Sequence, residues 1–227
     1  MLSSNLELPH RLNERYLLVE KIGAGGMGMV YRAYDRKLGK DIALKLVASE
    51  IGATDIIRFQ NEAKTIARLS HPNIVEVYDF GFLDKEENEL FIAMEYLEGM
   101  SLGELIEKRE KLHFTELIPL VVQALDGLSA AHKRDILHRD IKPSNLMLVP
   151  ESKKDGFMVK IVDFGLAKTS FEDQKLTKTG IPVGTPSYIS PEQVKGEEID
   201  PRTDIYSLGC LMYRALTGRL PFTGGDG

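Results

Sequence analysis

Two short stretches of the sequence carry residue types suited to phosphoryl chemistry. The stretch HRDIKPSN places a carboxylate, a lysine and an amide close together, at Asp140, Lys142 and Asn145. A second carboxylate, Asp163, opens the tripeptide DFG after the segment LMLVPESKKDGFMVKIV. Magnesium ions prefer carboxylate and carbonyl oxygens, so Asn145 and Asp163 are candidate metal ligands. Asp140 is then the candidate base for an attacking hydroxyl, and Lys142 the cation that stabilises charge on the transferred group.

Each of these motifs also has an ordinary structural explanation. A lone DFG is more often an Asp-Gly turn than a metal site, because both residues are common turn formers. Lys45, in the apolar stretch IALK, could be a strand lysine whose stem packs on the sheet. Glu62, in a helical segment, could be a solvated surface carboxylate. The order and spacing of all the motifs together favour the chemical interpretation.

The stretch KIGAGGMGMV has glycines in the spacing G-x-G-x-x-G, at Gly23, Gly25 and Gly28. Glycine lets backbone N–H groups approach phosphate oxygens, which serves several nucleotide folds as well as simple turns. A P-loop is excluded because Met29, rather than lysine, follows Gly28. A dinucleotide fold needs a helix after the glycines, whereas MVYRAYDRKLGKDIALKLV indicates a strand, a turn and a second strand. The remaining option is a glycine-rich hairpin over phosphates, with Lys45 on the following strand.

Composition favours an ordinary globular protein. The chain has 227 residues, 43% hydrophobic and 28% charged, with a net charge of −5, which gives no electrostatic reason to bind nucleic acid. Its one cysteine, Cys210, lies in an apolar helical pattern and is expected to be buried and inert. No run approaches the roughly 18 continuous apolar residues of a membrane span. The prediction is a cytoplasmic location, alone or as the cytosolic part of a longer membrane-anchored protein.

The periodicity of apolar residues divides the chain into a strand-rich part and a helical part. After an extension over 1–15, residues 16–96 are mostly strands interrupted by one helix near 54–69. Helices dominate 97–227, and the clearest begins with Thr115 as its N-cap. The fold class is therefore α+β, with two lobes and a ligand cleft expected between them.

The motifs in this order resemble the serine/threonine protein kinases, from about Tyr16 to Phe222. SPEQ together with GIPVGTPSYIS is most similar to the bacterial branch of that family. The resemblance implies the two-lobed kinase fold, with an antiparallel-sheet N-lobe and a mostly helical C-lobe. It rests on the glycine loop, Lys45, Glu62, Asp140, Asn145, the DFG tripeptide and SPE at Ser190, Pro191 and Glu192.

The resemblance also implies ATP as a ligand. Lys45 would contact the α- and β-phosphates and pair with Glu62 in the active state, and Met94 would occupy the gatekeeper position. The backbone of Glu95 and Leu97 would bond the adenine edge. The full predicted set of ATP-binding residues is Gly23, Ala24, Gly25, Gly26, Met27, Gly28, Val30, Ala43, Lys45, Glu62, Met94, Glu95, Leu97, Met147 and Val162.

The activity implied is transfer of the ATP γ-phosphoryl group, with Mg²⁺ or Mn²⁺, to serine or threonine hydroxyls of proteins. Lys142, two residues after Asp140, resembles the serine/threonine-specific pattern, and Thr185 would support both residues. Arg139 is expected to bind a phosphate, and Thr177 and Thr179 are similar to activating autophosphorylation sites.

The sequence departs from its relatives in stopping soon after the helix that contains Asp204. Similar kinases continue through further helices, one of which carries an arginine that pairs with the residue matching Glu192. Glu192 is therefore expected to be an unpaired, partly buried charge, and the Asp204 helix to expose an apolar face. A homodimer or a partner would cover this truncated lobe.

Two other functions remain open at this stage. A nucleotide-binding scaffold with little turnover is compatible with the truncation, although the intact Lys45, Asp140, Asn145 and Asp163 favour an enzyme. A dinucleotide oxidoreductase is a distant third, because the helix after the glycines is missing.

Overall fold

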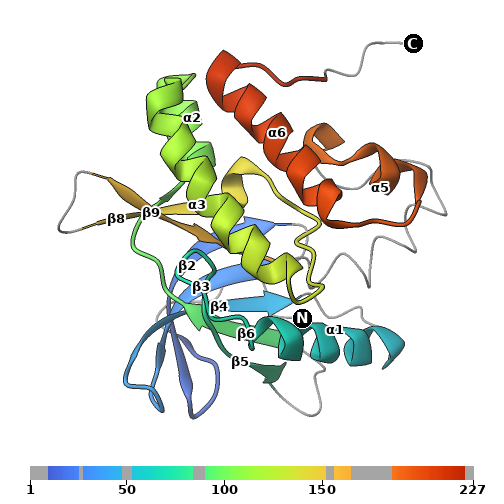
Figure 1. Cartoon of the computed structure of the whole chain (residues 1–227). Coiled ribbons are helices and arrows are strands. Elements are labelled where there is room, and N and C mark those ends of the chain that lie inside the picture. Colours follow the sequence, from blue (N-terminus) through green and yellow to red (C-terminus); the bar gives the residue numbers. More distant parts are fainter. Residues whose placement is uncertain are drawn as a thin grey trace. The chain divides into compact units, whose positions relative to one another are not determined.

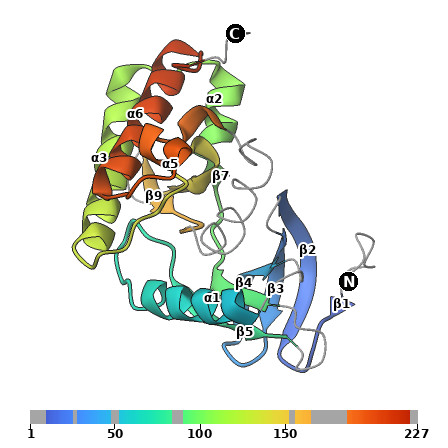
Figure 2. The same ribbon diagram turned by 90° about the vertical axis from the view of Figure 1, so that its right-hand side faces the viewer.

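The chain divides into two units. Figures 1 and 2 show the chain coloured by residue number. The first unit comprises Met1–Arg68 and Glu76–Leu97, and the second comprises Leu69–Val75 and Glu98–Gly227. The short segment 69–75 thus belongs with the second unit although it lies within the sequence of the first. The structure is a computed structural model that describes residues 10–25, 28–47, 53–83, 90–151, 156–164 and 186–222.

The first unit is built on a six-stranded antiparallel sheet in the order β1-β2-β3-β4-β6-β5. The strand, turn and strand predicted after the glycines are confirmed as β3 and β4, which pair along their whole lengths. One helix, α1, follows β4. The bounds are β1 (His10–Arg11), β2 (Tyr16–Gly25), β3 (Gly28–Asp35), β4 (Lys40–Val47), α1 (Ala53–Ile66), β5 (Val77–Phe82) and β6 (Leu90–Glu95).

One face of this sheet carries the core of the first unit. Residues directly opposite each other in an antiparallel pair point to the same face. Ala33 lies opposite Ile42, and Leu44 lies opposite Ala93, and all four side chains are 0% exposed. The alternate residues of the same strands therefore lie on the other face.

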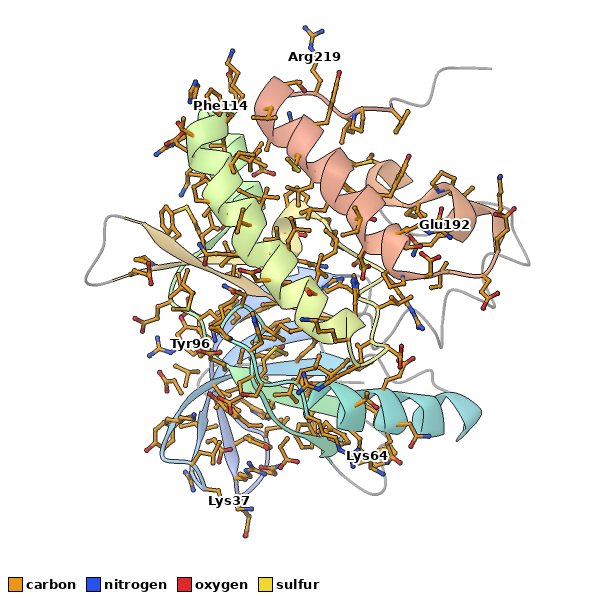
Figure 3. The ribbon with its side chains drawn as sticks, viewed as in Figure 1. Lys37, Lys64, Tyr96, Phe114, Glu192 and Arg219 are labelled. Carbon is orange, nitrogen blue, oxygen red and sulfur yellow. The ribbon has the colours of Figure 1, made fainter. Side chains whose placement is uncertain are left out.

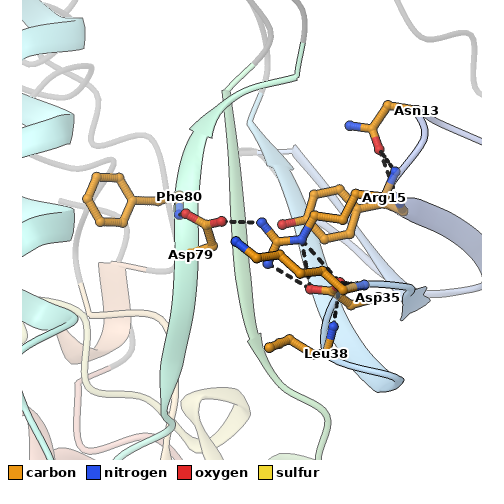
Figure 4. A network of polar contacts seen from close by, with 8 residues as sticks. Asn13, Arg15, Asp35, Leu38, Asp79 and Phe80 are labelled. Atoms are coloured by element: carbon orange, nitrogen blue, oxygen red, sulfur yellow. Dashed lines mark hydrogen bonds and ion pairs between the residues drawn. The ribbon is translucent and has the colours of Figure 1, made fainter.

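Arg15 ties three segments of the first unit together (Figure 4). Its guanidinium donates to both carboxylate oxygens of Asp35, with Nη2 2.8 Å from Oδ2, and also to Asp79 on β5. Asp35, the last residue of β3, is 0% exposed and also accepts the backbone N–H groups of Lys37 and Leu38. The buried carboxylate is therefore fully engaged, and it fixes the turn between β3 and β4.

The second unit is mostly helical and contains a three-stranded sheet in the order β7-β8-β9. Helices α3 and α6 pack side by side in both views, and α3 also packs on β9. The bounds are β7 (Met100–Ser101), α2 (Leu102–Arg109), α3 (Phe114–His132), the 3-10 helix η1 (Pro143–Asn145), β8 (Leu146–Pro150), β9 (Phe157–Ile161), the 3-10 helix η2 (Pro186–Tyr188), α5 (Pro191–Lys195) and α6 (Pro201–Thr217).

Helix α3 has apolar residues on both of its faces. Within the described ranges it is the one helix whose length and hydropathy would suit a membrane span, although the sequence was expected to contain none. Its side chains Leu117, Ala124 and Leu128 are nevertheless buried in the second unit, as in a core helix. The opposite side carries exposed apolar residues, among them Phe114, which is labelled in Figure 3.

The N-cap predicted for this helix was wrong by two residues. His113, with extended backbone, is the N-cap, and its Nδ1 accepts the backbone N–H of Thr115, which lies inside the helix. A histidine nitrogen can accept this bond as a hydroxyl would, so the preference of threonine for caps did not decide the boundary.

Glu192 was expected to be an unpaired, partly buried charge, and the structure shows it partly buried but hydrogen-bonded. Glu192, labelled on α5 in Figure 3, is half-buried and accepts a 2.6 Å hydrogen bond from the hydroxyl of Thr203 on α6. This bond is the first cause of the lowered pKa of the Glu192 carboxyl. The carboxylate thus finds a neutral donor on the neighbouring helix.

The apolar residues of α6 divide between two faces. Leu208, Leu211 and Ala215 are buried, as is the thiol of Cys210, whose pKa burial raises. In contrast, Ile205, Tyr213 and Leu216 are 46%, 47% and 36% exposed. The structure therefore shows the apolar surface expected on this helix.

Candidate active site

The loop before β8 brings together three of the predicted catalytic residues. The Lys142 ammonium lies 2.8 Å from Oδ2 of Asp140. The amide nitrogen of Asn145, which is only 4% exposed, donates to the backbone oxygen of Asp140 at 2.8 Å and more weakly to Oδ2 at 3.3 Å. These bonds fix the orientation of the amide, with Nδ2 towards Asp140 and Oδ1 directed away from it.

Asp204, near the start of α6, holds this loop from beneath. Its Oδ2 accepts the backbone N–H of His138 at 2.9 Å, and its Oδ1 accepts that of Arg139 at 2.8 Å. His132 on α3 donates from Nε2 to Oδ2 at 2.7 Å. Asp204 is 0% exposed, and burial alone would raise its pKa. The bond from His132 and the two backbone donors outweigh burial and lower the pKa of this carboxyl.

His138 connects the catalytic loop to the segment that carries Asp163. Its Nε2 lies 2.9 Å from the carbonyl oxygen of Val162, which can only accept, so Nε2 bears the proton. Its Nδ1 accepts the backbone N–H of Asp140 at 3.2 Å. The ring is thus held as a neutral tautomer, and burial lowers its pKa. The ring also packs against Phe164, with centroids 4.7 Å apart.

Two residues of the site have left-handed backbone conformations that are uncommon outside glycine. The φ angles are 64° at Arg139 and 58° at Asp163. Hydrogen bonds hold both peptide groups of Arg139, because Asp204 accepts its N–H and Gln193 donates to its carbonyl at 3.0 Å. Strain of this kind persists only where the surroundings over-determine it, and it concentrates at functional sites.

Asn145 and Asp163 lie in adjacent segments of backbone. The N–H of Val162 donates to the carbonyl of Asn145 at 3.0 Å, and Asp163 is the next residue. The described residues contain no group of three or more His, Cys, Asp or Glu side chains suited to a metal ion. One carboxylate and one amide oxygen nevertheless fit Mg²⁺, which usually takes one or two protein oxygens and completes its shell with water and substrate phosphates.

In the first unit, the strand register places four predicted ATP-binding residues on one face of the sheet. Val30 lies opposite Lys45, and Ala43 lies opposite Met94, while Ala43 and Lys45 are two residues apart on β4. They therefore share a face, and it is the face opposite the core. Three of them are largely buried, with exposures of 7% for Ala43, 9% for Lys45 and 7% for Met94.

Gly28 has a structural requirement of its own. Its φ of 134° is disfavoured for any residue with a side chain, and a Cβ there would overlap the carbonyl oxygen of Leu46. The glycine is therefore needed for β3 to pair closely with β4. Gly23 and Ala24 continue the pairing on β2, opposite Val30 and Met29.

Comparison with known proteins identifies the family. A model described as the protein kinase domain matches residues 16–227. The chain belongs to the protein kinase family. It is 40% identical over 213 residues to the serine/threonine-protein kinase pkn3 of Myxococcus xanthus, covering 92% of this chain and 38% of that protein. It is 37% identical over 220 residues to the serine/threonine-protein kinase PknB of Mycobacterium tuberculosis, covering 95% and 34%.

The chain thus spans about a third of the length of these curated relatives. Among solved structures, a crystal structure of the Mycobacterium tuberculosis PknI kinase domain matches with a TM-score of 0.77 and 28% identity, covering 98% of this chain and 83% of that one. The predicted α+β kinase fold and the resemblance to bacterial serine/threonine kinases are therefore confirmed. Membership of this family implies ATP and a divalent metal ion in general terms.

Other predicted kinase residues occupy separate elements or lie outside the description. Glu62 is on α1, Glu95 ends β6 and Met147 is on β8, while Leu97 follows β6. Gly25 ends β2. Five predicted residues lie outside the described residues, namely Gly26, Met27, Thr177, Thr179 and Thr185.

Several residues that support the loop before β8 were not predicted from the sequence. These include His132, His138 and Asp204, which together hold the backbone before Asp140. One signal was available, because Asp204 is a carboxylate within the otherwise apolar pattern of a core helix. Its partners could not be predicted, because they lie 66 and 72 residues away in the sequence.

Proposed function

We propose that this chain is the catalytic domain of a serine/threonine protein kinase that transfers the γ-phosphoryl group of ATP to protein hydroxyls. The observation that carries the proposal is the Asp140–Lys142–Asn145 arrangement, held on the buried Asp204. A base, a cation and a metal-ligating amide within one rigid loop are what phosphoryl transfer to a hydroxyl requires.

The proposed roles follow from the chemistry of each group. Asp140 accepts a hydrogen bond from the substrate hydroxyl and takes its proton as the new O–P bond forms, while the bond between the γ-phosphorus and the bridging oxygen breaks and ADP leaves. Lys142, whose ammonium already lies against Asp140, shifts towards the phosphoryl oxygens and stabilises their charge. Asn145 Oδ1 and the Asp163 carboxylate hold Mg²⁺ or Mn²⁺, which neutralises and orients the phosphates when bound. Lys45 binds the α- and β-phosphates.

Regulation by phosphorylation is part of the proposal. Arg139 comes directly before the base, and its strained backbone is fixed by Asp204 and Gln193. A phosphate on Thr177 or Thr179 that bonds to its guanidinium would order the segment between Asp163 and the SPE motif. Thr185 would support the loop from that segment.

The test of the activity is transfer of radiolabelled γ-phosphate from Mg-ATP to this chain and to a generic basic protein. Asp140→Asn should lower the rate by about 100-fold or more, because the base is lost. Asp126→Asn, an identical change at an exposed position of α3, is the matched control and should retain full activity. Equal labelling of wild type and Asp140→Asn would contradict the proposal. ATP binding without labelling in any variant would favour the nucleotide-binding scaffold instead.

The exposed apolar side chains of α6 motivate a proposal about assembly. Ile205, Tyr213 and Leu216 span about three helical turns, and we propose that a second copy or a partner protein covers them. A monomer at all concentrations in sedimentation experiments would contradict the homodimer. Substrate proteins carrying serine or threonine, rather than nucleic acid, are the expected targets of this acidic chain.

We also place the domain in the cytoplasm, alone or as the cytosolic part of a membrane-anchored protein. Its proposed use of ATP and its single buried thiol support this location. Fractionation of cells that express the whole protein tests it, and recovery of the domain outside the cytosolic face would contradict it.

A further inference from the structure

The side-chain amide of Gln123 on α3 uses both its oxygen and its nitrogen in hydrogen bonds. Its partners lie on β9 and in the segment 69–75. Its Oε1 accepts the backbone N–H of Val159 at 2.9 Å and the side-chain amide of Asn73 at 3.2 Å. Its Nε2 donates to the carbonyl of Phe157 at 3.0 Å. One side chain therefore contacts both β9 and residue 73 of the same unit.

Asn73 completes the contact from the other direction. It is 7% exposed, and its amide nitrogen also donates to the carbonyl of Val159 at 2.9 Å. Its carbonyl accepts the N–H of Ile161 at 2.9 Å, and the carbonyl of Ile161 accepts the N–H of Val75 at 3.0 Å. Gln123 and Asn73 thus take the place of a neighbouring strand along the edge of β9 that does not pair with β8.

Gly127, one helical turn after Gln123, allows α3 to come this close. A Cβ at this glycine would lie 2.9 Å from Cδ1 of Ile161 and 3.0 Å from the carbonyl oxygen of Asn73. Both distances are shorter than ordinary packing permits, so a larger residue at position 127 would push α3 away from β9. Gln123 and Gly127 are four residues apart and therefore lie on the same face of α3, the face that contacts β9. The contact between α3 and β9 thus combines several hydrogen bonds with close packing.

Strand β9 leads directly to the proposed metal ligand. Ile161, its last residue, is followed by Val162, which bonds to His138 and Asn145, and then by Asp163. A shift of β9 along α3 would therefore displace Asp163 and strain the bonds that Val162 makes with His138 and Asn145. Groups bonded directly to metal ligands typically change metal affinity by about 10- to 100-fold when they are replaced. Gln123 acts on Asp163 through β9, so its effect is expected at the lower end of that range.

We propose that Gln123 is a positioning residue for the metal site, acting through β9 on Asp163. This inference deepens the proposed function and rests on it, because it takes Asp163 as a metal ligand. Gln123 touches neither substrate nor metal. Its role is to fix the position of β9 so that the carboxylate of Asp163 and the amide of Asn145 face one cation.

The experiment measures Mn²⁺ binding directly, by electron paramagnetic resonance, with a non-hydrolysable ATP analogue present. Gln123→Ala should raise the Mn²⁺ dissociation constant by about 10-fold, and the Mg²⁺ concentration for half-maximal activity by a similar factor. Gln123→Glu keeps an acceptor for Val159 and Asn73 but has no donor for Phe157, so it should show a smaller rise. Asp126→Ala, exposed on the same helix, is the control and should match wild type.

A merely structural role gives a different result. In that case Gln123→Ala would lower the melting temperature and speed hydrogen exchange at Val159, while the Mn²⁺ dissociation constant of the folded protein stayed within twofold of wild type. That outcome overturns the inference, as would wild type that binds no Mn²⁺. If Gln123→Ala does not fold, Gln123→Glu decides by the same measurement. Wild type that binds Mn²⁺ but transfers no phosphate would contradict the proposed function alone.

Discussion

Each unit of this kinase domain contains a fully buried aspartate, and the two are neutralised in different ways. Asp35 in the first unit and Asp204 in the second are both 0% exposed. The guanidinium of Arg15, a permanent cation, bonds both oxygens of Asp35 (Figure 4). Asp204 instead bonds His132 and two backbone N–H groups that precede Asp140.

This difference separates a structural carboxylate from a positioning one. In the first unit, the ion pair joins Arg15 to the end of β3, so it fixes the architecture of the sheet at any pH above the acid range. In the second unit, the carboxylate holds the backbone of Arg139 in a strained conformation next to the proposed base. Replacing Asp35 should therefore affect stability, whereas replacing Asp204 should affect stability and catalysis together.

The largest effect is expected for Asp204→Ala. Loss of the carboxylate leaves the N–H groups of His138 and Arg139 without their acceptor, which should lower the free energy of unfolding by about 2–6 kcal/mol. Because the strained Arg139 backbone is released, phosphoryl transfer per folded molecule should fall by about 100-fold or more. Denaturant titration and initial rates test both effects. Asp200→Ala, which removes the exposed N-cap of the same helix, should leave the rate unchanged.

Asp35→Ala should lower stability by a similar amount without affecting catalysis. Loss of the carboxylate leaves the N–H groups of Lys37 and Leu38 without their acceptor, which should cost about 2–6 kcal/mol. Arg15 keeps its ion pair with Asp79. The rate per folded molecule should equal that of wild type. A drop in that rate as large as the one for Asp204→Ala would remove the distinction between the two aspartates.

The dependence of stability on pH should report the buried histidine of the second unit, His138. Burial lowers the pKa of His138 from its ordinary value of 6.5, so below that pH the unfolded chain binds a proton that the folded chain does not. Stability should be constant above pH 7 and should fall by about 1.4 kcal/mol per pH unit below 6.5. His138→Gln should lower this slope by about 1.4 kcal/mol per pH unit, which is the contribution of one proton. An unchanged slope in the variant would show that other groups cause the loss.

At lower pH, the two aspartates should themselves contribute. The pKa values of Asp35 and Asp204 are both lowered from 3.8 despite burial, chiefly by hydrogen bonds from Arg15 and from His132. Their stabilisation is therefore present above pH 3.8 and is lost as pH falls towards the folded values. Asp35→Asn and Asp204→Asn should each flatten the unfolding curve in that acid range, as measured by circular dichroism.

The smallest effect is expected for Asp41→Ala. Asp41 on β4 forms an ion pair with Arg32 on β3. Unlike Asp35, which is 0% exposed, the side chains of Asp41 and Arg32 are 34% and 36% exposed. Exposed ion pairs are screened by water and salt, so the unfolding midpoint should match that of wild type. A loss comparable to that of Asp35→Ala would show that burial is not what distinguishes these aspartates.

The elements that carry the site were largely predictable from local patterns. The turn at Leu38 and Gly39 between two β-branched runs predicted β3 and β4, and the apolar spacing in α3 and α6 predicted both helices. The first turn of α3 was less predictable, because the cap is His113 and not Thr115. Helix ends depend on one side-chain contact, whereas helix interiors depend on many repeated ones.

Contacts between distant segments were the part that the sequence could not supply. Glu192 was expected to be unpaired, yet Thr203 donates to it from the next helix. The segment containing Asn73 was expected to belong to the first lobe, yet its hydrogen bonds to β9 and Gln123 join it to the second unit. A polar side chain has many partners of equal chemical merit, and only the packing of the chain selects one.

The sequence by itself determined the kind of chemistry, because the order and spacing of the glycine loop, Lys45, Asp140, Asn145 and Asp163 together favour phosphoryl transfer. Only the tertiary structure decided how those groups are held. Asp204 is brought beneath the loop, and β9 is fixed against α3, by contacts between residues 34 to 86 positions apart. Residue types record which atoms can react, whereas their positions depend on contacts that form only when the whole unit packs.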